Sequence, residues 1–360
     1  MKMSWLMPWI VVACARPPQP VAPGDDLYAL EVHRVAEGIY VAMRPEPLRL
    51  YVEGNATIII NEHDVVVVDA GGAPLAARNV IAEIRKLTPN PVRYVINTHI
   101  HRDHRFGLQE YVKAFPGVEI IAHPEIRDII AATSPKYLND VIARTNGPQR
   151  ELEDEVARLR RDPAPGNDRI IAHIERLLTR DIHAIRREYR TVRNVPPTLT
   201  VDQRLVLHRG DRRIEVVFLG AGDTRQDLVV VLPRDRVVCT GDMVVHPFPY
   251  GYSDQPLEWA TTLGKLAALD FDILIPGHGE VQRGKAYVEK VAALLRSVRE
   301  QVAAAIADGL DLAAARARVD LSSFESELTG GDPVKRYYFR EYFSYPNIER
   351  TYRALAAPAR

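Results

Sequence analysis

The sequence is poor in cysteine, neutral in net charge and without a long apolar run. Two cysteines among 360 residues are too few for a disulfide framework, which excludes the small disulfide-stapled folds. The 47 basic and 47 acidic side chains balance, so no net field attracts a polyanion and nucleic acid binding gains no support. A chain of this length with 46% hydrophobic residues can instead bury one sizeable core or two.

The amino terminus has the pattern of a processed leader. Lys2 precedes a mostly apolar stretch, 3–13, which is too short to cross a bilayer of about 30 Å as a helix. A short apolar run behind a positive charge is typical of a signal peptide. The run Val11-Val12-Ala13-Cys14 also resembles a bacterial lipobox, and a polar, proline-rich tether follows it. We therefore expect residues 1–25 to direct export, either to the periplasm after plain cleavage or to a membrane anchor through lipidated Cys14.

Strand and helix patterns divide the rest of the chain into three regions. Apolar runs typical of strands occur at 30–35, 39–43, 56–60, 65–69, 92–96, 118–122, 205–207, 214–219, 228–232 and 236–240, with a helical pattern at 74–87. Residues 125–195 carry apolar stripes at helical spacing, which predict a helical insertion. We expect a mixed α/β domain over 26–282 that contains this insertion, followed by a C-terminal helical extension over 283–360.

Four metal-binding side chains lie within six residues at the end of one predicted strand. His99 and His101 stand two apart where strand alternation stops, so both can face one metal ion. Asp103 and His104 then turn toward a second position. If these four side chains had only a structural role, the fold would have to bury or expose four polar groups together without a functional gain. Burying polar groups without hydrogen-bond partners is energetically costly. The cluster predicts a metal centre.

The run Thr98-His99-Ile100-His101-Arg102-Asp103-His104 resembles the Thr-His-x-His-x-Asp-His signature of the metallo-β-lactamase superfamily. Other landmarks of that family follow in the expected order over roughly residues 30–280. The resemblance implies that Asp69 orients metal-bound histidines, that Asp242 bridges two metals and that His278 completes the second site. It also implies an α/β (α+β) fold, a four-layer αββα sandwich with the metals at one edge between its two sheets.

One landmark departs from the family pattern. Asp223 stands where the resemblance places a third histidine. An aspartate can ligate, and with His99 and His101 it forms a set that suits Fe²⁺ or Mn²⁺ better than three imidazoles do, although zinc also accepts it. We therefore expect two divalent metals, zinc first, with iron or manganese as alternatives. The other interpretation is that Asp223 makes only a turn or a supporting hydrogen bond.

The resemblance implies hydrolysis of a small molecule by a water that two metals activate. Asp103 would hold the second metal and orient the nucleophile or relay a proton, while Asp242 would hold both metals. Four residues that follow Asp242 closely are candidates for the substrate pocket: His246, Phe248, Tyr250 and Tyr252. We expect the substrate to carry a carbonyl group, as an ester, lactone, lactam or thioester.

Two rival functions and two structural roles stay open. True zinc β-lactamases place Cys or Ser where Asp242 stands, so antibiotic hydrolysis is a secondary expectation. A binding protein on a degenerate hydrolase fold is supported only by Asp223, because the other expected ligand positions are intact. The insertion and the C-terminal helices are expected to cover the rim of the active site or to form a homodimer contact. The aromatic residues at 337–343 are interpreted as a packing face.

Overall fold

The computed structural model describes residues 25–44, 53–132 and 149–357. The predicted leader up to residue 24, with Cys14, lies outside these ranges, and export and lipid attachment stay predictions. None of the helices within the described ranges is long and apolar enough to cross a membrane.

The first sheet joins seven strands in chain order. They are β1 (Glu31–Ala36), β2 (Ile39–Met43), β3 (Ala56–Ile60), β4 (Val65–Val68), β5 (Val92–Ile96), β6 (Glu119–Ala122) and β7 (Leu199–Thr200). The pairs from β1 to β4 are antiparallel and those from β4 to β7 are parallel. Parallel neighbours need crossover connections, and α1 (Pro74–Leu87) supplies the first of them. As a result, Asp69 and the residues after Ile96 leave the sheet at the same edge.

The second sheet has six strands in the order β13-β12-β11-β10-β9-β8. Their bounds are β8 (Arg204–Arg209), β9 (Arg212–Phe218), β10 (Leu228–Leu232), β11 (Val237–Cys239), β12 (Ile273–Ile275) and β13 (Gln282–Arg283). β11 and β12 run parallel, connected through η3 (Gly241–Met243) and α9 (Trp259–Ala267). Asp242 and His278 follow the carboxyl ends of these two strands, while Asp223 precedes β10.

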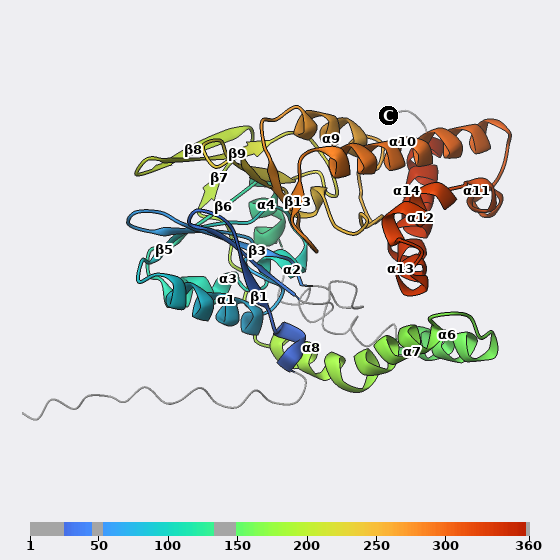
Figure 1. Ribbon diagram of the computed structural model, residues 1–360, viewed down its shortest axis with the longest axis horizontal. Coiled ribbons are helices and arrows are strands. Elements are labelled where there is room, and N and C mark those ends of the chain that lie inside the picture. The colour runs from blue at the N-terminus through green and yellow to red at the C-terminus, as the bar shows by residue number, and fades with distance from the viewer. Residues whose placement is uncertain (1–24, 45–52, 133–148, 358–360) are drawn as a thin grey trace, which may run out of the picture.

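The two sheets stack face to face between two layers of helices (Figure 1). Alternate residues of the strands fill the space between the sheets, including Ile59, Val66, Val216 and Val230. The opposite face of the first sheet packs against α1 and α3 (Leu108–Ala114). The opposite face of the second sheet packs against α9 and α10 (Ala286–Ala307). This arrangement confirms the predicted αββα sandwich.

Further helices surround the sandwich, some beside the first sheet and its helices and others beside the second. Those at 124–189 are α4 (Pro124–Ala132), α6 (Gln149–Arg161), α7 (Asn167–Arg176), the π-helical turn η2 (Leu177–Asp181) and α8 (Ile182–Tyr189). Those near the carboxyl terminus are α11 (Leu312–Arg318), α12 (Ser322–Thr329), α13 (Pro333–Tyr338), the π-helical turn η4 (Phe339–Ser344) and α14 (Tyr345–Ala356). Ile174 of α7, Leu295 of α10 and Phe339 of η4 belong to one buried cluster. The insertion and the extension therefore share a hydrophobic core, and the domain boundaries expected from the sequence stay a prediction.

Candidate metal centre

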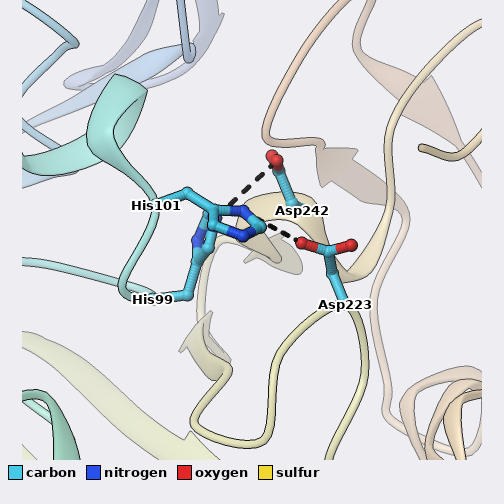
Figure 2. Close-up of side chains that lie close together, drawn as sticks. All are labelled: His99, His101, Asp223 and Asp242. Atoms are coloured by element: carbon cyan, nitrogen blue, oxygen red, sulfur yellow. Dashed lines mark ion pairs between the residues drawn. The ribbon is translucent and has the colours of Figure 1, made fainter. Parts of the chain in front are cut away.

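Two groups of metal-binding side chains meet between the carboxyl edges of the two sheets. In the first group His99, His101, Asp223 and Asp242 each offer a ligand atom, and these atoms lie within 4.8 Å of one another. His101 Nδ1 is 3.1 Å from Asp223 Oδ2, and His99 Nε2 is 3.7 Å from Asp242 Oδ2. Figure 2 shows the two imidazoles, from the loop after β5, facing the two carboxylates from the second sheet. The structure thus brings Asp223 beside both histidines.

The second group consists of Asp103, His104, Asp242 and His278. His104 Nε2 is 3.1 Å from Asp242 Oδ1, and His278 Nε2 is 3.0 Å from Asp103 Oδ2 and 3.3 Å from Asp242 Oδ1. Asp242 is the member that both groups share. Its carboxylate lies between the two groups, where a ligand that bridges two cations would lie.

The buried polar atoms of these groups match the needs of a cation. His99 and Asp223 are 0% and 2% exposed, yet His99 Nε2 and Asp223 Oδ1 have no hydrogen-bond partner among the described residues. Buried polar atoms are nearly always paired, so two orphaned acceptors side by side require an explanation. Three carboxylates and four imidazoles are a donor set that zinc, iron and manganese accept. The residues present therefore fit a divalent metal in each group.

Asp69 fixes the orientation of Thr98 and His104 in the histidine motif. Its Oδ1 accepts a hydrogen bond from the Thr98 backbone N–H at 2.8 Å, and its Oδ2 accepts one from the Thr98 hydroxyl at 2.9 Å. Asp69 Oδ2 also lies 2.8 Å from His104 Nδ1, while Thr98 Oγ1 lies 2.9 Å from His99 Nδ1. With both Nδ1 atoms engaged, His104 and His99 turn their Nε2 atoms toward the cluster. The structure places Asp69 in the orienting position that the sequence indicated.

Charges within the centre shift the protonation of its members. Burial lowers the pKa of His99 well below its ordinary value, which leaves its ring neutral. Burial acts the same way on His101, but the Asp223 carboxylate outweighs it and raises the pKa of His101 to about 9. For His278, burial is outweighed by Asp242 and by the hydrogen bond with Asp103, and its pKa rises to about 9. In the metal-free protein these two rings hold protons that a metal would displace.

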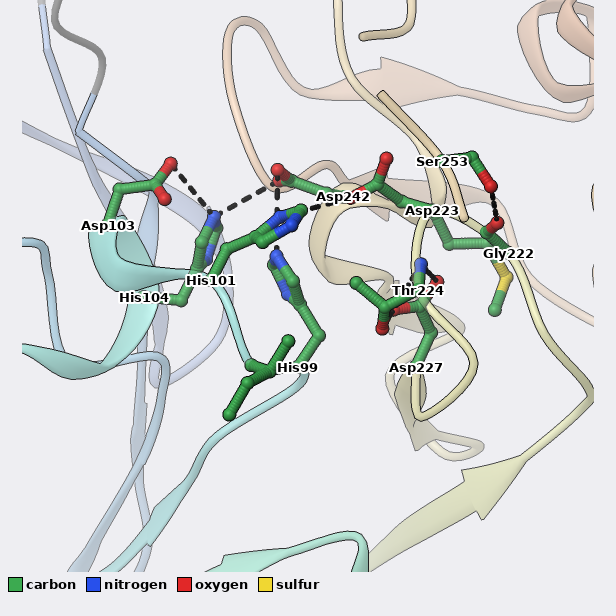
Figure 3. Close-up of polar contacts among 12 residues, drawn as sticks. His99, His101, Asp103, His104, Gly222, Asp223, Thr224, Asp227, Asp242 and Ser253 are labelled. Carbon is green, nitrogen blue, oxygen red and sulfur yellow. Dashed lines mark hydrogen bonds and ion pairs between the residues drawn. The ribbon is translucent and has the colours of Figure 1, made fainter. Parts of the chain in front are cut away.

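The loop that carries Asp223 is fixed by hydrogen bonds on both sides. Asp227 accepts hydrogen bonds from the Thr224 backbone N–H at 3.1 Å and from the Thr224 hydroxyl at 2.6 Å, which closes the turn (Figure 3). The Ser253 hydroxyl donates to the Gly222 carbonyl at 2.7 Å. The Leu228 N–H donates to the Thr98 carbonyl at 2.9 Å, which ties this loop to the histidine motif. The carboxylate of Asp227 closes the turn, which leaves the Asp223 carboxylate to face His101.

A pocket of about 290 Å³ opens on the metal-binding groups. It is lined by His101, Asp103, Asp223, Asp242, Tyr250, Tyr252 and Tyr342. Of the four candidate pocket residues, Tyr250 and Tyr252 line it. Phe248 is fully buried and the ring of His246 packs 5.3 Å from that of Tyr287, and neither is among the described lining residues. The tyrosines form an aromatic wall, because the Tyr250 and Tyr342 rings meet edge to face at 5.7 Å.

Sequence reasoning missed Tyr342 as a pocket residue. Tyr342 belongs to the aromatic run that was interpreted as a packing face, and its neighbours Phe339 and Phe343 are indeed fully buried. Helical spacing gives no signal, because Tyr342 shares an i, i+4 register with Tyr338, which is also fully buried. Nothing in the sequence near Tyr342 indicates that it faces a motif more than sixty residues earlier in the chain.

Comparisons with known proteins agree with this geometry. The family model of the metallo-beta-lactamase superfamily matches residues 51–278. A curated relative, a linear primary-alkylsulfatase from a Pseudomonas species, is 25% identical over 246 residues, which are 66% of this chain and 43% of the relative. The chain thus spans less than half the length of that relative.

Two solved structures share the fold. A metallo-beta-lactamase from Pontibacter korlensis superposes with a TM-score of 0.52 at 16% identity, covering 74% of this chain and 99% of its own. A stereoselective inverting sec-alkylsulfatase from a Pseudomonas species superposes with a TM-score of 0.61 at 18% identity, covering 91% of this chain and 50% of its own. The family model covers more than half of the chain, and its landmarks are the residues that the structure gathers at one edge. The chain belongs to the metallo-β-lactamase superfamily.

Proposed function

We propose that this protein is a dinuclear metal-dependent hydrolase that cleaves esters of small organic molecules. The observation that carries the proposal is the pair of ligand groups that share Asp242 and open on a tyrosine-walled pocket. Divalent metals in such groups lower the pKa of water and polarise a substrate oxygen.

The residues around the pocket divide the remaining tasks. Asp103 and His101 both hold a ligand atom and line the pocket, so a substrate enters between the first group and the second. Asp103 is positioned to orient the attacking water and to take up its proton. Burial, together with Asp242 and Asp103, holds the pKa of Tyr250 well above its ordinary value. The Tyr250 phenol therefore stays protonated, and it would donate a hydrogen bond to a substrate oxygen.

We infer that alkyl sulfate esters are the first substrate class to test. The curated relative is named a linear primary-alkylsulfatase, and the structural neighbour named a sec-alkylsulfatase covers 91% of this chain, against 74% for the lactamase. The wider coverage means that helices outside the sandwich also superpose on the sulfatase. Sulfate ester hydrolysis needs the same parts as the hydrolysis of a carbonyl ester: an activated water and stabilisation of an oxygen that gains charge.

Carboxylic esters and lactones are the second class, favoured by one feature of the pocket. Its described lining residues include three tyrosines but no lysine or arginine, so an anionic sulfate would rely on the metals alone for positive charge. A neutral carbonyl substrate has no such need. Parallel assays of octyl sulfate, by sulfate release, and of p-nitrophenyl octanoate, by phenolate release, distinguish the two classes.

The Asp242→Ala variant tests the two-metal mechanism. Because both groups share Asp242, its loss should lower metal content from about two ions per chain to one or none and abolish ester hydrolysis while the protein stays folded. The measurements are elemental mass spectrometry, turnover and circular dichroism. Asp211→Ala removes a carboxylate that pairs with Arg234 at the surface and should behave as the parent. Unchanged turnover in Asp242→Ala would refute the two-metal mechanism. If the parent protein has full metal content but no turnover, the result would favour a binding protein.

A further inference from the structure

We propose that a groove beyond Tyr252 binds the alkyl chain of the substrate and sets the preference for chain length. The inference rests on the proposed ester hydrolysis and specifies where the organic part of the ester lies. Within the described residues this groove measures about 550 Å³. Its walls include Tyr252, Asp254 and Pro256 from the loop before α9, and Pro346, Arg350 and Ala354 from α14.

Tyr252 connects the groove to the metal pocket. Its side chain lines both cavities and is 46% exposed. The Tyr252 hydroxyl donates to the Glu341 carbonyl at 3.3 Å, which anchors the ring on η4. A chain attached to an ester at the metal-binding groups can therefore leave the pocket across this ring and continue into the groove.

One helical face runs the length of this path. Tyr342 lines the metal pocket, and Pro346, Glu349, Arg350 and Arg353 line the groove. These positions follow one another at intervals of three or four residues, with Arg350 next to Glu349, which is the spacing of a single helix face. Tyr342 lies in the π-helical turn η4, and the seven steps from Pro346 to Arg353 within α14 add roughly 10 Å at about 1.5 Å per residue. The path is long enough for an extended alkyl chain of a detergent-like ester.

The loop wall is held in place before any substrate arrives. The Gly251 N–H donates to the Tyr342 carbonyl at 2.7 Å. A Cβ at residue 251 would overlap the Phe343 carbonyl, so only glycine allows the two backbones this contact. Arg350 Nη1 donates to the Ser253 carbonyl at 3.4 Å, and the Ser253 hydroxyl bonds to the loop that carries Asp223. The same loop thus supports the groove and the first metal-binding group.

The charges that line the groove already have partners. Arg353 pairs with Glu349 at 2.5 Å, and Asp254 lies 3.8 Å from Arg225. The lining arginines can offer a ligand their aliphatic stems, beside the rings of Pro256 and Pro346. Such a surface suits an uncharged, unbranched alkyl chain better than an additional anion.

Filling the groove tests the proposal. Ala354→Trp places a large ring in the groove, and Asp254→Trp does so from the opposite wall. The assay uses the metal-loaded full chain and a series of butyl, octyl and dodecyl sulfates or p-nitrophenyl esters. In each variant, the ratio of kcat/KM for the longest chain to kcat/KM for the shortest should fall by about tenfold. Ala356→Trp, the same change at an exposed position two residues further along α14, should keep the parent ratio.

Direct binding separates the failure of this proposal from that of the proposed function. Calorimetric titration with butane-, octane- and dodecanesulfonate measures affinity without turnover. Affinity that rises with chain length in the parent and not in Ala354→Trp supports the groove. If the parent shows this dependence but hydrolyses no ester, only the proposed function is refuted. Equal affinities along the series in the parent, or the same length dependence in the parent and in both tryptophan variants, would refute the groove.

Discussion

Asp223 differs from the histidine expected at its position in charge and in reach. Its carboxylate approaches His101 at 3.1 Å while the turn behind it is closed by Asp227. A carboxylate adds negative charge to the first group, which lowers the Lewis acidity of a metal bound there and favours iron or manganese relative to a three-imidazole set. We therefore expect the choice of metal at this group to depend on Asp223.

Substitution of Asp223 tests this dependence. Asp223→Ala should reduce the metal content from about two ions per chain to about one, because the second group keeps its own four ligands. Asp223→His should raise zinc occupancy of the first group. Asp227→Asn is the matched control, since it alters the neighbouring buried carboxylate but keeps an acceptor for the Thr224 N–H. Elemental mass spectrometry after zinc reconstitution measures all four proteins, and equal zinc in the parent, Ala and His forms would mean that Asp223 is not a ligand.

Elements with strong periodicity were predictable from the sequence, and those set by distant contacts were not. The helix at Pro74–Leu87 and the strands β2, β3, β5 and β10 match the expected bounds, because valine-rich strands and an amphipathic helix carry their own pattern. β12 and β13 have only three and two residues and show no periodicity. The long apolar stripe at 170–185 is interrupted by the π-helical turn η2, which spacing alone does not reveal.

The same distinction applies to the candidate site. Most of its candidate ligands could be proposed from the sequence, because the histidine motif, Asp242 and His278 each follow the end of a strand. Tyr342 could not be predicted, since it reaches the pocket only through the packing of η4 against the second sheet and its helices. Residues that act through local geometry leave a signal in the sequence, while residues placed by tertiary packing do not.

The C-terminal helices should unfold together with the sandwich. Phe339 is fully buried in the cluster that joins η4 to α10 and to the second sheet. Phe339→Ala should lower the free energy of unfolding by about 3–5 kcal/mol in a single urea transition. Tyr345→Ala, at a residue 45% exposed, should change it by less than about 0.5 kcal/mol. Two transitions, of which only one responds to Phe339→Ala, would show instead that the extension folds independently of the sandwich.

At the scale of the whole molecule, the metal centre makes stability depend on pH in a way that reports metal binding. In the metal-free protein, carboxylates raise the pKa of His101 and His278 from about 6.5 to about 9 against the effect of burial. The folded state then binds more protons than the unfolded state between these values. The stability that these protons contribute is complete below pH 6.5 and is lost as the pH rises through about 9.

Chelator-treated protein should therefore become less stable from pH 6.5 to about 9, by at most about 1.4 kcal/mol per pH unit for each retained proton. The contribution of His101 should be the smaller one, because its side chain is 40% exposed and solvent screens its pairing with Asp223. Metal displaces both protons, so the loaded protein should not show this decline, and its metal affinity should rise with pH. Urea unfolding of the two forms across this range measures the difference. Parallel pH dependences would mean that these histidines do not exchange protons for metal, which would contradict the assignment of both ligand groups.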